Sequence, residues 1–68
     1  MNAREAIQIA IDAVEGDGLL EGEIIEKVAT PDTLEDAEVW RVELSTASDT
    51  AVVLVDKATG EVLEMAIR

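Results

Sequence analysis

Carboxylates are the main candidates for acid–base chemistry in this chain, because the sequence contains neither histidine nor cysteine. Thiolate nucleophiles, imidazole bases and the usual zinc ligands are therefore excluded. Glu35, Asp36 and Glu38 form an acidic cluster, but a carboxylate acts as a base near neutral pH only where burial raises its pKa, and a polar loop does not bury it. Ser45 and Ser48 have no base beside them. We expect no catalytic residues and no enzyme.

A break in the apolar pattern at Asp56-Lys57-Ala58-Thr59-Gly60 is the second place where a site could lie. A calcium loop needs about six to eight oxygen ligands, whereas this segment offers Asp56, the Thr59 hydroxyl and Glu61. An Asp that bonds backbone amides, followed by a glycine with positive φ, is typical of a tight turn. We predict a structural turn built on Asp56 and Gly60, with no metal and no cofactor; the acidic cluster predicts at most weak capture of a divalent cation.

An amphipathic helix is the first element that the pattern predicts. Asn2 and Glu5 have the spacing of a capping box, and Gly16 and Gly18 are expected to end the helix. Apolar residues recur at spacings of three and four, which places them on one stripe. The residues of this stripe are Ala3, Ala6, Ile7, Ala10, Ile11 and Val14.

Four strands are expected after the helix. The first is the least regular and is expected to be bulged near Gly22 or at Ile24-Ile25, and a loop around Pro31 is expected to follow it. The predicted strands are Leu19–Thr30, Glu38–Leu44, Ala51–Val55 and Glu61–Ile67, and the predicted loop is Thr30–Asp36.

These elements predict an α+β fold in which one N-terminal helix packs on one face of an antiparallel sheet of about four strands, within a single domain of residues 1–68. Alternation places Trp40, Val42, Leu44, Leu63, Met65 and Ile67 beneath the helix. Trp40 is interpreted as a core anchor, with an interface anchor as the alternative.

Acidic residues dominate the charge of the chain, with sixteen Asp and Glu against five Lys and Arg and a net charge of −11. Such a surface repels phosphate backbones and anionic lipid, so we expect no binding to nucleic acid or to membranes. It suits a basic partner, or a halophile in which counterions screen self-repulsion. The compartment stays open: cytoplasmic if Met1 is the native start, extracytoplasmic if the chain is an excised domain.

Three segments resemble the PepSY domain family. Glu5–Ala10 resembles its opening helix, Val39–Leu44 resembles its aromatic-x-Val-x-hydrophobic strand, and Val53–Leu63 resembles its closing VD-x-x-TG-x-V hairpin, the most specific of the three. The resemblance covers about residues 3 to 63. It implies a helix over an antiparallel sheet, no catalytic residues, and a role in binding and restraining peptidases.

The sheet face without a helix is the candidate interaction surface. Alternation puts apolar side chains on it among charged ones, and an apolar patch open to water marks an interaction site. We expect a non-catalytic acidic protein-binding module that acts through this face or a sheet edge, with a protein partner or a second copy; the alternatives are a peptidase-restraining domain, or isolated surface residues without a binding role. The candidate residues are Val39, Arg41, Val52, Leu54 and Val62.

Overall fold

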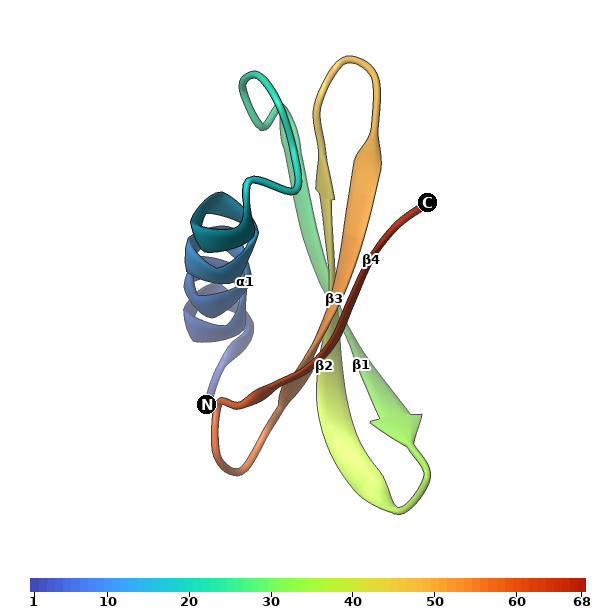
Figure 1. Cartoon of the computed structure of the whole chain (residues 1–68). Helices are drawn as coiled ribbons and strands as arrows, with labels where there is room; N and C mark the ends of the chain where they lie inside the picture. The colour runs from blue at the N-terminus through green and yellow to red at the C-terminus, as the bar shows by residue number, and fades with distance from the viewer.

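The computed structural model describes all 68 residues and lays one helix across one face of a four-stranded antiparallel sheet (Figure 1). Helix α1 spans Ala3–Asp17, and the strands are β1 (Glu26–Leu34), β2 (Ala37–Ser45), β3 (Thr50–Asp56) and β4 (Val62–Ile67). Their order in the sheet is β1-β2-β3-β4, so β1 and β4 are the two edges. The predicted α+β fold is confirmed.

Helix α1 begins and ends with the predicted types of cap. The Asn2 side chain accepts from the Glu5 N–H at 2.9 Å, and the Glu5 carboxylate accepts from the Asn2 N–H at 3.0 Å, which completes the capping box. At the other end Gly18 takes the left-handed conformation with φ of +63°, and its N–H caps the last turn. Gly16, which the pattern also places at the helix end, lies inside the last turn, so Gly18 alone is the cap.

The hydrophobic core lies between the buried stripe of α1 and the central strands. The three buried residues of the helix are Ala6, Ala10 and Val14, and the strands contribute Val42, Leu44, Ala51, Val53 and Val55. Trp40 packs against this cluster from β2, in agreement with the core interpretation, and its indole N–H donates to the Met1 carbonyl at 3.4 Å. Lys57 Nζ lies 4.7 Å from the centroid of the same ring.

The sequence pattern places the first strand too early in the chain. Residues 19–25 form the loop that leads out of α1, and β1 occupies Glu26–Leu34. Its first half lies within the predicted strand, and its second half, after Thr30, lies where the sequence predicts a loop. Pairing with β2 explains the difference, because an edge strand tolerates Pro31 where the missing N–H faces outward. The chain then reverses at Glu35 and Asp36, with Glu35 at a φ of +56°. A turn of only two residues replaces the predicted loop.

The predicted face of Val62 is wrong, because the last hairpin contains a bulge. The pairing of β3 with β4 shifts by one residue between Leu54, which lies opposite Glu64, and Val55, which lies opposite Val62. Val62 therefore packs against the core on the side of the helix, not on the opposite face. Leu63, which alternation places beneath the helix, is instead the extra residue of the bulge and is 37% exposed.

Candidate functional site

The segment Asp56–Gly60 is a turn held by its own hydrogen bonds. The Asp56 carboxylate accepts from the N–H groups of Ala58 at 2.7 Å and Thr59 at 3.0 Å. The Gly60 N–H donates to the Asp56 carbonyl at 2.9 Å, and Gly60 has a φ of +78°. Asp56 and Gly60 thus take the structural positions expected of them in a hairpin turn.

A shallow acidic depression separates the two turns at this end of the sheet. It is lined by Asp36 and Glu38 from the first hairpin and by Asp56 and Lys57 from the last. No group of three or more carboxylates in the structure has an arrangement that could hold a metal ion. Glu35, Asp36 and Glu38, the acidic cluster of the sequence, are all exposed.

The uncovered face, meaning the side of the sheet opposite α1, holds four of the five residues predicted as an interaction surface. Val39 is fully buried there and Leu54 is only 9% exposed, although no helix lies over them. Val52, on the same strand as Leu54, is half-buried. The large apolar side chains of this face are thus mostly covered by their neighbours, and little of the predicted patch is open to water.

Charged side chains dominate what the uncovered face shows to solvent. Arg41 Nε lies 3.9 Å from carboxylate oxygens of both Asp32 and Glu43. Arg68 adds a closer pair, with its guanidinium 3.1 Å from Glu43. These pairs are exposed or partly exposed and contribute little stability, but they make polar much of the face on which the sequence places apolar side chains among charged ones.

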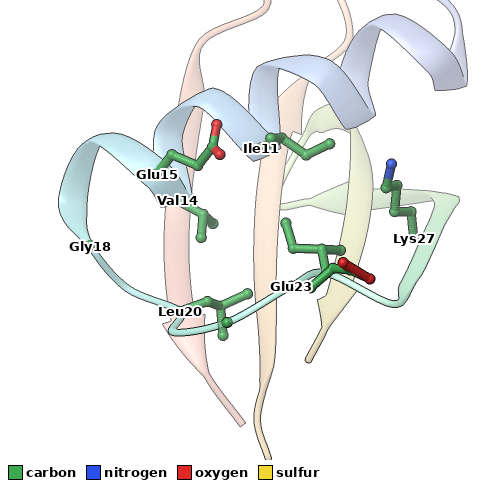
Figure 2. A pocket seen from close by; sticks show the side chains of 9 residues that line it. Ile11, Val14, Glu15, Gly18, Leu20, Glu23 and Lys27 are labelled. Carbon is green, nitrogen blue, oxygen red and sulfur yellow. The ribbon is translucent and has the colours of Figure 1, made fainter. Parts of the chain in front are cut away.

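A groove of about 450 Å³ lies between the last turns of α1 and the loop that follows it (Figure 2). In Figure 2, Ile11, Val14 and Leu20 form apolar walls, while the Lys27 side chain extends from β1 toward the helix. The sequence pattern did not indicate this groove. It has room for an apolar side chain, and its lining also includes Glu15, Glu23 and Lys27.

The hydrogen bonds between neighbouring strands show which backbone groups point outward at the two edges of the sheet. The Lys57 N–H donates to the Glu38 carbonyl at 3.1 Å, so even-numbered β2 residues bond to β3 and odd-numbered ones to β1. The β1 residues opposite these odd-numbered β2 residues are Glu26, Val28, Thr30, Asp32 and Leu34. The remaining β1 residues, which are Lys27, Ala29, Pro31 and Thr33, direct their backbone groups outward.

The outer edge of β1 is protected against a further strand. Pro31 has no N–H in the middle of the edge. The Thr33 N–H is already bonded to the Asp32 carboxylate at 2.8 Å. Lys27 adds a charge near the start of the strand. Proline and lysine on an edge strand are devices that block pairing with another chain.

The outer edge of β4 has none of these protections. The Arg68 N–H donates to the Thr50 carbonyl at 2.8 Å, so the alternation of antiparallel pairs leaves the N–H and C=O of Met65 and Ile67 pointing away from β3. The strand contains no proline and no lysine, and Ile67 is 42% exposed. In Figure 1 no other segment crosses this edge. Met65 and Ile67 are not among the predicted interaction residues, although the lack of proline and lysine in this last strand is a visible signal.

Comparison with known proteins places these features in a family context. The family model described as PepSY, peptidase propeptide and YPEB domain, matches residues 1–66 of the chain. No curated protein and no solved structure gives a significant match. The structure contains no helix long and apolar enough to cross a membrane.

Proposed function

The chain belongs to the PepSY domain family, and from this premise we propose that residues 1–68 act as a non-catalytic protein-binding domain whose partner adds a strand to the outer edge of β4. The family is one of propeptide and regulatory domains, not of catalytic ones. Binding by strand addition uses backbone hydrogen bonds for affinity and alternate side chains for specificity, and it needs no catalytic group.

The asymmetry of the two edges is the observation that carries this proposal. On β1, the proline and the Asp32 carboxylate remove two of the outward donors. On β4, the outward N–H and C=O groups of Met65 and Ile67 remain available, and the side chains of these two residues are apolar. Unprotected edges of this kind accept an extended segment from another chain.

Peptidase restraint is the second candidate function, and it is consistent with the family description, which names a peptidase propeptide domain. The β4 edge supports it on physical grounds. An edge strand pairs with an extended segment, and peptidases carry extended-peptide sites beside their catalytic groups. A peptidase is accordingly the first foreign partner to test.

Backbone N-methylation tests the use of the β4 edge without changing a side chain. At 68 residues the chain can be assembled by chemical synthesis with N-methyl-Met65, and N-methyl-Ala29 on the β1 edge is the matched control. Neither N–H bonds within the chain, so both variants should keep the fold, which circular dichroism checks.

The assay is inhibition of a panel of purified metallopeptidases by micromolar domain. We expect the unmodified chain and N-methyl-Ala29 to slow at least one enzyme. N-methyl-Met65 should inhibit about tenfold more weakly or worse, because the hydrogen bond from the Met65 N–H to the added strand and the contacts beside it are lost. Equal inhibition by the two N-methyl variants would show that β4 is not the contact. A lack of inhibition across the panel would count against peptidase restraint.

A further inference from the structure

We propose that the strand bound at β4 is β4 of a second copy of this chain, antiparallel to the first, with the two Ala66 residues opposite each other on a two-fold axis. This inference rests on the proposed function, because it names a partner for the same edge. The two sheets would then form one continuous sheet with both helices on the same side.

The backbone restricts the registers that two β4 strands can adopt. The outward groups belong to Met65 and Ile67, so an added strand must place its own outward-facing residues opposite them. If one strand were shifted by one residue relative to the other, an outward backbone group of one copy would face a backbone group that is already bonded to β3 in the other. The allowed two-fold registers are therefore centred on Glu64, Met65, Ala66 or Ile67 in each copy.

Three of these registers are poor. Centring on Glu64 places two like charges directly opposite each other, which is destabilising. Centring on Met65 sets Glu64 against Ala66 of the other copy and Arg68 against Val62, whose side chain the bulge directs to the other face. Centring on Ile67 sets Ala66 against Arg68 of the other copy, so Arg68 faces no opposite charge.

The register centred on Ala66 places opposite charges across from each other. It places Glu64 of each copy opposite Arg68 of the other, so two oppositely charged pairs form across the axis. These are non-hydrogen-bonded pairs, whose Cα atoms lie about 4.5 Å apart, and the small Ala66 fits at the axis. Arg68 already bonds Glu43 at 3.1 Å, and its guanidinium has five donors with which to hold a second carboxylate.

Apolar pairing favours the same register on the opposite face. Met65 of each copy would lie opposite Ile67 of the other, on the side of the sheet that carries α1. Ile67 is 42% exposed in the single chain, so pairing would cover apolar surface that water now contacts. Hydrogen bonds, charge and apolar contact thus agree on one arrangement.

Overall charge opposes the association and makes it depend on salt. Each copy carries −11, so two copies repel each other at low ionic strength. Molar salt shortens the screening length to about 3 Å and should remove most of this repulsion. The dimer is therefore expected to be tighter at molar salt than at low salt.

The test measures solution mass by sedimentation and light scattering at low and at molar salt, for the unmodified chain and for Glu64→Arg. Glu64→Arg makes the chain less negative, so general repulsion falls, yet the proposed register then sets the new guanidinium against Arg68 of the other copy. We expect dimerisation about tenfold weaker or more. Glu61→Arg, the control, makes the same change in charge outside the paired strand, so it should dimerise as tightly as the unmodified chain or more tightly.

Charge exchange between copies gives the second measurement. An equimolar mixture of Glu64→Arg and Arg68→Glu should form a heterodimer, because each variant supplies what the other lacks. A monomer at all concentrations and salts, or equal tightening by Glu64→Arg and Glu61→Arg, would overturn the inference. If the chain is monomeric while N-methyl-Met65 still loses peptidase inhibition, only the dimer is wrong and the proposed function stands.

Discussion

Leu54→Ala tests whether the uncovered face is a binding patch or part of the packed interior. Leu54 is only 9% exposed, so the substitution removes side-chain contacts that water does not replace. Buried Leu→Ala changes cost about 2–5 kcal/mol, and a sheet face without a helix can relax, so we expect about 2–3 kcal/mol. Val52→Ala is the matched control, because Val52 lies on the same strand and face but is half-buried.

Urea unfolding followed by the fluorescence of Trp40, the only tryptophan, measures the effect. A domain of this size has roughly 3–5 kcal/mol of stability in total, and a slope of about 1 kcal/mol per molar urea moves the midpoint of Leu54→Ala down by about 2 M. Val52→Ala should cost about 1 kcal/mol or less. Equal small losses at both positions would refute the reasoning and restore the open apolar patch that alternation predicts.

Two further predictions concern the last turn and the charge. Gly60→Ala should lower the free energy of unfolding by about 1–2 kcal/mol, because φ is +78° and the new Cβ would lie 2.9 Å from Met1 Cε. Gly16→Ala should raise the free energy of unfolding by about 0.5–1 kcal/mol, because Gly16 lies inside the helix with nothing within 4 Å of the new Cβ. Urea unfolding of the two variants should therefore show changes of opposite sign. Raising NaCl from low to molar concentration should raise the melting temperature, since the chain carries −11, and a flat response would show that self-repulsion is unimportant.

Local side-chain chemistry explains why the helix and the last turn are predictable. The capping box depends only on Asn2 and Glu5, three residues apart, and both of its bonds form within that span. The turn depends on Asp56 and Gly60, and its hydrogen bonds to the Asp56 carboxylate and carbonyl form within the same segment. Features of this kind need no information from distant parts of the chain.

The first strand is misplaced by the sequence pattern because its evidence is not local. Pro31 and the residues around it have the composition of a turn, and only pairing with β2 makes them a strand. Whether proline is tolerated depends on which way its nitrogen faces, and that follows from the edge position of β1 in the sheet. Composition alone therefore favours the wrong element.

The interaction residues show what alternation can and cannot predict. It places Val39 and Leu54 on the correct face, but it does not give their burial, which depends on the side chains that neighbouring strands bring over them. It fails for Val62, because one extra residue in the bulge reverses the face of the strand beyond it. The lack of proline and lysine in β4 is visible in the sequence, but only the order of the strands shows that β4 lies at an edge.

An open edge strand is an aggregation hazard, and the charge of the chain offers a physical reason why this protein can retain one. Two chains that approach with −11 each repel at any orientation, so indiscriminate pairing of β4 edges is suppressed. A register that brings Glu64 to Arg68 offsets part of this repulsion, and registers that bring like charges together add to it. The same charge that suppresses unspecific association thus favours one specific pairing, and a basic segment from a foreign partner would compete for the edge with the further advantage of its opposite charge.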